Sequence, residues 1–229
     1  MKILAIETAT KACSAALWLE GELIEQFELA PQRHANLILS QIDQCFSQAK
    51  LKKGDIDALA FGEGPGAFTG VRIAAGVIQG LALGWDKPVI AVSSLEALIW
   101  QAYLETGQTH WHAFLDARMK EVYWQSGHIQ DEKLISQPCQ LLKLEALPKV
   151  EAAGIGDIAT EYPEVVASYQ NQTSWLTAYP KASAIAAIAS QRPETMHLLE
   201  QKIPLPVYLR NNVADKPKAS KNDSTEKGA

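Results

Sequence analysis

The sequence lacks paired cysteines and an excess of positive charge. Its three cysteines, Cys13, Cys45 and Cys139, are widely spaced and form no Cys-x-x-Cys pair, which argues against a disulfide framework and a thiolate metal site. With 21 basic against 26 acidic residues, the formal net charge is -5. Such a chain has no basic field that would hold RNA. We therefore expect a protein of a reducing, cytoplasmic compartment that meets nucleic acid only through a partner.

The sequence also lacks a long uninterrupted apolar segment. The apolar run at residues 3–6 ends at Glu7 and is too short for a signal peptide. The longest apolar stretch, residues 68–83, is interrupted by Arg72 and is shorter than the roughly 20 residues of a membrane span. We expect no contact with a membrane.

A strand, a glycine-rich turn and a helix form the centre of the sequence. Residues 56–61 are apolar and bounded by glycines, which is typical of a buried strand. Three glycines and Pro65 follow within residues 62–66 and predict a sharp turn. Residues 68–83 are almost all small or apolar, which predicts a helix that is buried on most sides.

Gly76, Gly80 and Gly84 recur every four residues of that helix and share a face with Arg72. Each interior glycine lowers helix stability by roughly 1 kcal/mol relative to alanine. The row therefore indicates that another backbone approaches closely. That backbone belongs either to the protein's own sheet or helices, or to a partner subunit. A third interpretation is that the amino end of the helix points at a phosphate.

The order of elements repeats in the two halves of the chain. The first half predicts strands at 2–6, 14–19, 23–29, 56–61 and 89–92, with helices at 37–49, 68–83 and 93–105. Ser93 and Glu96 have the spacing of a capping box. The second half predicts strands at 111–115, 122–126, 129–135 and 151–155, a helix at 181–191 and an apolar piece at 207–209. We divide the chain into subdomains at 1–108 and 109–214 and a disordered polar tail at 215–229.

Two carboxylates, Glu7 and Asp116, follow the first strand of each half. They could face a phosphate or magnesium ion, or be ordinary solvated side chains. His110, His112 and His128 could bind a metal or be ordinary edge histidines. No serine has the context of a nucleophile elbow, so a hydrolase is disfavoured.

Three motifs in the first 125 residues carry a family resemblance. They are GPGAFTGVRI at 64–73, KPVIAVSSLE at 87–96 and DARMKEVY at 116–123, and they resemble the TsaB (YeaZ) family. The repeated order of elements is that of the actin-like ATPase fold. The resemblance thus implies an α/β protein of the ribonuclease H-like (ASKHA) class, with two related subdomains, each a mixed sheet with flanking helices.

The resemblance implies a role in making threonylcarbamoyladenosine in transfer RNA. The catalytic subunit of that pathway is a paralogue, TsaD, and an ATPase, TsaE, joins them. TsaD-like proteins hold a metal with two histidines, where this sequence has Ser94 and Leu98, and neither side chain replaces an imidazole ligand. Residues 154–157 are at best a remnant of an adenosine-binding segment. We expect no metal, no cofactor and no catalytic residues, and we interpret Glu7 and Asp116 as vestigial nucleotide-facing residues.

Our leading hypothesis is a non-catalytic scaffold and activator of TsaD, acting with TsaE. The modification is N6-threonylcarbamoylation of the adenosine next to the anticodon, position thirty-seven, in tRNAs reading codons that start with adenine. Alone, the chain would form a homodimer through the same surface. The alternative is a stand-alone actin-fold ATPase or phosphotransferase, or a peptidase.

The two apolar helices of the first half predict the partner interface. The residues assigned to it are Leu37, Ile38, Gln41, Ile42, Cys45, Phe68, Arg72, Ile73, Gly76, Val77 and Gly80. On this assignment, Val77→Glu or Ile38→Glu buries a charge in the interface. Either variant is expected to separate the complex on a sizing column while circular dichroism finds the domain folded.

Overall fold

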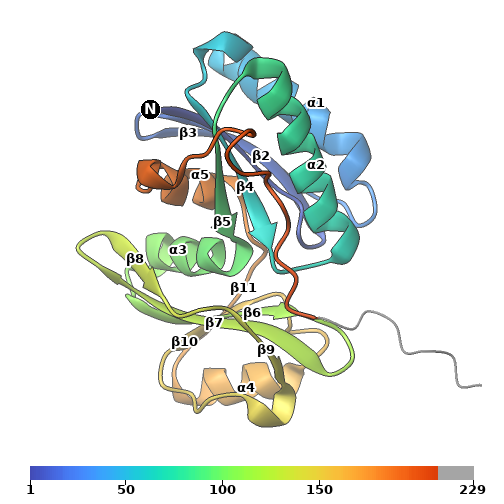
Figure 1. The fold of residues 1–229 in the computed structure, drawn as a ribbon. Helices are drawn as coiled ribbons and strands as arrows, with labels where there is room; N and C mark the ends of the chain where they lie inside the picture. The colour runs from blue at the N-terminus through green and yellow to red at the C-terminus, as the bar shows by residue number, and fades with distance from the viewer. Residues whose placement is uncertain (211–229) are drawn as a thin grey trace, which may run out of the picture.

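The computed structural model describes residues 1–210 as two lobes, each built on one β-sheet (Figure 1). The first sheet has the order β3-β2-β1-β4-β5 and the second has the order β11-β10-β6-β7-β8, with β9 paired to β7. The strands of the first sheet are β1 (Lys2–Glu7), β2 (Ala12–Leu19), β3 (Glu22–Leu29), β4 (Ala58–Gly64) and β5 (Val89–Ser93). Those of the second are β6 (His110–Asp116), β7 (Glu121–Gln130), β8 (Lys133–Ser136), β9 (Gln140–Lys143), β10 (Ala153–Gly156) and β11 (Trp175–Thr177).

The two sheets share one topology. In the first, β1, β2 and β3 form an antiparallel meander, and β4 and β5 add parallel to β1. In the second, β6, β7 and β8 form the meander, and β10 and β11 add parallel to β6. This repetition confirms the actin-like fold of two related subdomains.

Helices cover both faces of each lobe. The α-helices are α1 (His34–Ala49), α2 (Phe68–Trp85), α3 (Ser94–Thr106), α4 (Pro163–Gln172) and α5 (Ala182–Ser190), and the short 3-10 helices are η1 (Lys53–Asp55), η2 (Leu144–Ala146) and η3 (Pro193–Thr195). Helices α1 and α2 pack on one face of the first sheet and α5 packs on the other. Helix α3 lies between the lobes, and α4 covers the outer face of the second sheet.

The strands of the first sheet are apolar on both faces because both are covered. Leu4 and Ile6 of β1 face α1 and α2, whereas Ile3 and Ala5 face α5. This is the continuous apolar pattern of a sheet enclosed by helices. The α5 side is rich in alanine on both the helix and the sheet, so the two can approach closely.

The structure differs from the predicted element order in the second half. Residues 129–135 are not one strand, because Asp131 and Glu132 adopt positive φ angles of 50° and 58° and turn the chain from β7 into β8. Asp131 suits the first position of such a turn, but Glu132 stands where a glycine is usual. The sequence analysis also missed β9, α4 and β11.

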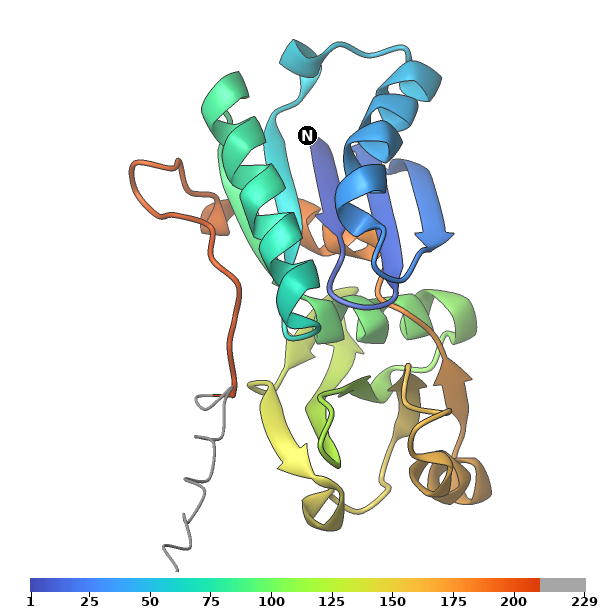
Figure 2. The same ribbon diagram turned by 90° about the vertical axis from the view of Figure 1, so that its right-hand side faces the viewer.

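The chain returns to the first lobe before it ends. Helix α5 packs against the first sheet, and the following residues run beside α2 (Figure 2). The expected second subdomain, 109–214, is therefore wrong in its later part, since the second sheet ends with β11 at Thr177. The predicted disordered tail at 215–229 lies outside the described residues.

The composition of α2 predicted a helix that is buried on most sides, and this prediction is wrong. Over its 18 residues it is long and apolar enough to cross a membrane by length and composition, with 33% of them buried in the fold. Val71, Ala74 and Ile78 pack on the sheet. Gly76 and Gly80 are exposed, and an added Cβ there would meet no described atom within 4 Å outside the neighbouring backbone of α2.

Two glycines of α2 provide a matched pair for a stability test. A Cβ at Gly70 would lie 2.0 Å from the Thr8 carbonyl oxygen, whereas a Cβ at Gly80 meets open space. Gly70→Ala is expected to lower the free energy of unfolding by about 1–3 kcal/mol through overpacking. Gly80→Ala is expected to raise it by up to about 1 kcal/mol through helix propensity. Urea unfolding of the monomer measures both, and equal effects would contradict the packing described here.

Candidate functional site

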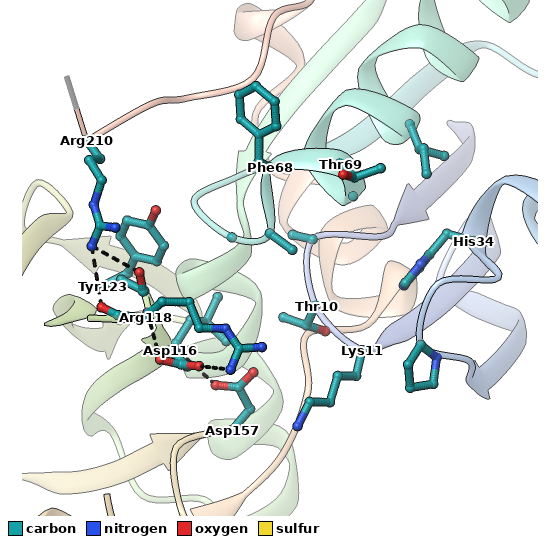
Figure 3. Close-up of a pocket in the computed structure, with 18 of the residues that line it drawn as sticks. Thr10, Lys11, His34, Phe68, Thr69, Asp116, Arg118, Tyr123, Asp157 and Arg210 are labelled. Atoms are coloured by element: carbon teal, nitrogen blue, oxygen red, sulfur yellow. Dashed lines mark hydrogen bonds and ion pairs between the residues drawn. The ribbon is translucent and has the colours of Figure 1, made fainter. Parts of the chain in front are cut away.

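A cavity of about 740 Å³ opens between the two lobes (Figure 3). Its walls are the turn after β1, the amino end of α2, the turn between β6 and β7, and residues 207–210. The close-up shows Lys11, Thr10 and His34 on the side of the first lobe and Asp116, Arg118 and Asp157 on the other. The cavity is therefore a cleft between the lobes with ionisable groups on both sides.

Two carboxylates line the cleft on the side of the second lobe. Asp116 ends β6 and Asp157 follows β10, and because these strands are parallel neighbours their carboxyl ends meet at one edge of the sheet. Asp157 Oδ1 accepts the Asp116 backbone N–H at 3.0 Å. Burial is the largest cause that raises the pKa of Asp157 to about 6, and the nearby Asp116 charge adds to it.

Asp116 is held by three donors. Its Oδ1 accepts the Arg118 backbone N–H at 2.8 Å and the Tyr162 hydroxyl at 3.2 Å, and its Oδ2 pairs with the Arg118 guanidinium at 3.0 Å. Asp116 thus lines the cleft, and its role as a vestigial nucleotide-facing residue stays a prediction. The sequence analysis did not identify Asp157 as a carboxylate of the same cleft. The signal for it is its position directly after a strand that is parallel to β6.

The glycines of residues 154–157 serve packing in the sheet. A Cβ at Gly156 would lie 1.9 Å from the Phe114 carbonyl oxygen, and one at Gly154 would overlap the Trp175 ring. Both glycines are therefore explained by their own neighbours. The hypothesis of an adenosine-binding remnant gains no support from them.

Glu7 does not share the cleft with Asp116. Its side chain is fully buried, and its two carboxylate oxygens accept the Ser94 hydroxyl and the Ala9 backbone N–H, each at 2.6 Å. A Cβ at Gly62 would lie 1.9 Å from this carboxylate, so Gly62 makes room for it. The interpretation of Glu7 as nucleotide-facing is wrong in this structure, because the residue belongs to the core.

Burial determines the acidity of Glu7. Desolvation raises its pKa from 4.5 to about 7, and the hydrogen bonds from Ser94 and the backbone oppose that shift. The resemblance stated above sets Ser94 and Leu98 against the metal-binding histidines of TsaD-like proteins. Ser94 here supports a buried carboxylate, and Leu98 packs in the core against the second sheet.

The histidines line a separate hollow of about 260 Å³ on the second lobe. His112 is buried, its Nδ1 lies 2.7 Å from the Tyr169 hydroxyl, and burial lowers its pKa. The rings of His110 and His128 stack with centroids 5.2 Å apart. Within residues 1–210 no three His, Cys, Asp or Glu side chains are grouped so that they could hold a metal ion.

The capping box at the start of α3 is only half formed. The Ser93 hydroxyl accepts the backbone N–H groups of Leu95 and Glu96, as a cap does. The Glu96 carboxylate instead pairs with Arg192 at 2.8 Å and accepts the Ser136 hydroxyl. Glu96 thus connects α3 to the segment after α5 rather than to its own cap.

The predicted partner interface divides into a buried and an exposed part. Four of its members, Ile38, Gln41, Ile42 and Cys45, are buried against the first sheet. Gln41 donates to the Cys13 carbonyl oxygen at 3.1 Å. The single apolar stripe of α1 is used for the protein's own core, so these four residues are not available to a partner and Ile38→Glu would unfold the domain.

The remaining members lie along α2, apart from Leu37 of α1, and Arg72 is the one charged residue among them. Phe68, Arg72, Gly76 and Gly80 are exposed, and Leu37, Ile73 and Val77 are half-buried along the groove between α1 and α2. From Ile73 to Gly84 this helix carries no charged residue. Figure 2 shows α1 and α2 in front of the first sheet, with the outer side of α2 uncovered by any other described helix.

Two lobes on one repeated topology, a helix between them and a cleft at the strand ends define an α/β protein of the actin-like ATPase class. A family model described as "TsaD: tRNA N6-adenosine threonylcarbamoyltransferase" matches residues 26–150. The "tRNA threonylcarbamoyladenosine biosynthesis protein TsaB" of Escherichia coli is 38% identical over 228 residues, which cover 93% of this chain and 96% of that protein. The chain belongs to the TsaB family, which confirms the resemblance stated above.

Two further relatives support the same family membership. The TsaB protein of Haemophilus influenzae is 35% identical over 226 residues, covering 93% of this chain and 95% of that one. A solved structure from Pseudomonas aeruginosa, described as an uncharacterized protein with similarity to peptidase YeaZ, has a TM-score of 0.82 at 36% identity. It covers 91% of this chain and 99% of that chain. These similarities support involvement in tRNA threonylcarbamoyladenosine biosynthesis.

The buried carboxyl of Glu7 predicts a pH dependence of stability. Its folded-state pKa of about 7 lies above the unfolded value of 4.5, so its contribution is complete below about pH 4.5 and is lost as the pH rises through 7. The wild type is expected to lose up to about 3 kcal/mol over this window relative to Glu7→Gln, which does not titrate. Urea unfolding of both proteins at several pH values measures the difference. A difference that does not change with pH would contradict the raised pKa.

Proposed function

We propose that this protein is a non-catalytic subunit of tRNA threonylcarbamoyladenosine biosynthesis that binds TsaD and stabilises its active form. It acts in the cytoplasm together with TsaE. The product is N6-threonylcarbamoyladenosine next to the anticodon, at position thirty-seven. The observation that carries the proposal is the open, uncharged glycine row of α2, on a chain whose first half matches the TsaD family model.

The glycine row supports close contact with another helix. Three glycines at four-residue spacing weaken α2, yet outside the neighbouring backbone of α2 no described atom lies within 4 Å of where their Cβ atoms would be. Packing within the chain therefore does not account for them. Small residues in register allow two helix backbones to approach more closely than the usual 8–10 Å between axes. A partner helix is the simplest explanation of the row.

The extent of the family match supports TsaD as that partner. It covers residues 26–150 and so includes both α1 and α2. A paralogue with this domain offers two corresponding helices, and the two pairs would form a bundle of four. A second copy of this chain offers the same pair, so a homodimer is expected when TsaD is absent.

The environment of Ser94 and Leu98 supports a non-catalytic role. Both side chains are fully buried. Ser94 donates a hydrogen bond to Glu7, and Leu98 packs against the second sheet. The net charge of -5 disfavours tRNA binding by the isolated chain. In this proposal the RNA is bound by the complex with TsaD.

The second candidate is a stand-alone ATPase or phosphotransferase. The cleft of about 740 Å³ and the carboxylates of Asp116 and Asp157 favour it. Calorimetry with magnesium and ATP on the isolated chain, and on Asp157→Asn, separates the two functions. Tight binding and turnover that Asp157→Asn abolishes would replace the scaffold proposal.

The peptidase alternative has less support. The hydroxyl of Ser94 donates to Glu7 at 2.6 Å and that of Ser93 to Gln125 at 3.0 Å. Neither hydroxyl is paired with a histidine. A nucleophilic serine needs an adjacent base that accepts its proton.

Gly80→Glu is the sharpest test of the partner face. A side chain at this position meets open space in the isolated protein, so the variant should fold. Val77 is half-buried against the core, so Val77→Glu would not separate a loss of folding from a loss of binding. A charge buried without a partner in the interface is expected to weaken TsaD binding by about 100-fold or more. Calorimetric titration with TsaD and an assay of the modified nucleoside measure the loss.

Leu104→Glu is the matched control. Leu104 lies on α3 and is 61% exposed, so this variant adds the same charge to an exposed apolar position away from α2. It should bind TsaD like the wild type. Normal binding by Gly80→Glu would refute the face, and a wild-type protein that fails to bind TsaD at all would refute the function.

A further inference from the structure

Residues 203–210, which we call the C-terminal strap, run in extended form along one side of α2 (Figure 2). Three hydrogen bonds fix it to the first lobe. Gln79 Nε2 donates to the Pro204 carbonyl oxygen at 2.6 Å, and Arg72 Nε donates to the Tyr208 hydroxyl at 2.8 Å. The Val207 backbone N–H donates to the Glu63 carbonyl oxygen at 2.8 Å. The strap is therefore a docked part of the fold.

The far end of the strap reaches the second lobe. The Arg210 guanidinium pairs with the Glu121 carboxylate. It also donates to the Ala117 carbonyl oxygen at 3.1 Å, and Figure 3 shows Arg210 at the edge of the cleft. These groups flank the turn between β6 and β7, where three successive residues, Arg118, Met119 and Lys120, have positive φ angles of 64°, 57° and 60°. The strap is thus anchored at both ends, which fixes its course beside α2.

The glycine row lies between the strap and α1. On a helix with 3.6 residues per turn, Arg72 and Gln79 point to the strap side, and Gly76 and Gly80 lie next to them around the helix. Ile73 and Val77 come next and line the groove toward α1. A helix laid over the glycine row would therefore have the strap on one side and the α1 groove on the other.

The strap removes polar groups from this surface and adds apolar ones. It occupies the side chains of Arg72 and Gln79, and the Arg72 guanidinium also stacks on the Phe68 ring at 3.7 Å. The strap itself exposes large apolar side chains, with Leu205 62% and Ile203 59% exposed. Tyr208 is 45% exposed and lies against Phe68.

A stable heterodimer needs a larger contact area than α1 and α2 alone provide. The outer face of an 18-residue helix such as α2 is about 27 Å long and about 10 Å wide, or about 270 Å². The outer side of α1 offers a similar area, so the two helices together present about 500 Å². A stable interface buries about 800 Å² on each partner. The strap, with eight residues at about 3.3 Å each, extends this surface by a further segment about 26 Å long beside α2.

We propose that the strap is a third element of the TsaD-binding surface, and that a TsaD helix packs between it and α1 with Leu205 and Ile203 against its side. The inference rests on the proposed function and deepens it. The occupant is a helix of TsaD because residues 73–84 of α2 carry no charge and the family match includes α1 and α2. The strap lies outside residues 26–150, so it is a contact that this chain contributes beyond the shared helices.

Leu205→Glu tests the strap directly. Leu205 is more than half exposed, so the variant should keep the melting temperature of the wild type. Its affinity for TsaD, measured by calorimetric titration with the full-length proteins, is expected to fall by about tenfold or more, as for an apolar anchor at an interface. Leu104→Glu is again the control and should bind normally. Hydrogen exchange of residues 203–209 should slow when TsaD is added.

The outcomes separate this inference from the proposed function. If Gly80→Glu abolishes TsaD binding and Leu205→Glu leaves it unchanged, the strap is not part of the surface and only this inference fails. If neither variant affects the complex, the α2 face fails as well. Faster exchange in the strap on addition of TsaD would mean that the partner displaces it, which also overturns the inference. Loss of the homodimer without loss of TsaD binding would make a second copy the occupant.

Discussion

The fold depends on α3, whose residues from Ser94 to Trp100 are buried between the two lobes. Ala97 and Trp100 pack toward α5 and the first sheet, whereas Leu95, Leu98 and Ile99 pack on the second sheet. This one helix therefore joins the two cores. Its first turn also makes polar contacts to distant segments, where Ser94 donates to Glu7 and Glu96 pairs with Arg192. A change that moved α3 would disturb both lobes and the cleft between them.

The two outer helices of the first lobe have different roles. Helix α1 has a single apolar stripe and uses it against β2, with Cys45 and Gln41 hydrogen-bonded to strand carbonyls. Helix α2 is apolar around most of its circumference, and the sheet covers only part of it. The uncovered part carries the glycine row and is bordered by the C-terminal strap. This difference is the physical basis for assigning partner binding to α2 more than to α1.

Much of the fold follows from local sequence patterns. The apolar runs of β1, β4 and β5 and the stripe of α1 identified the first sheet and its helix, and the three motifs identified the family. The second half was harder because β8, β9 and β11 are short and its β7–β8 turn uses Asp131 and Glu132 in left-handed conformation. Short strands carry too few residues for a periodic signal.

The site was less predictable than the fold. A carboxylate at the end of a strand can face a cleft, as Asp116 does, or turn into the core, as Glu7 does. That choice depends on neighbours distant in sequence, here Gly62 and Ser94. Likewise, the stripe Ile38, Ile42 and Cys45 shows that α1 has an apolar side, but only the tertiary structure shows that β2 already covers it.

The open glycine row also affects how α2 behaves before it meets a partner. A glycine exposes the backbone amide and carbonyl groups around it to water and leaves the chain more conformational freedom than any other residue. The solvent-facing turns of α2 are thus the part of this helix with the least intrinsic order. Some of the free energy of association would be spent on stiffening these turns, so recognition and local ordering are thermodynamically linked in this domain.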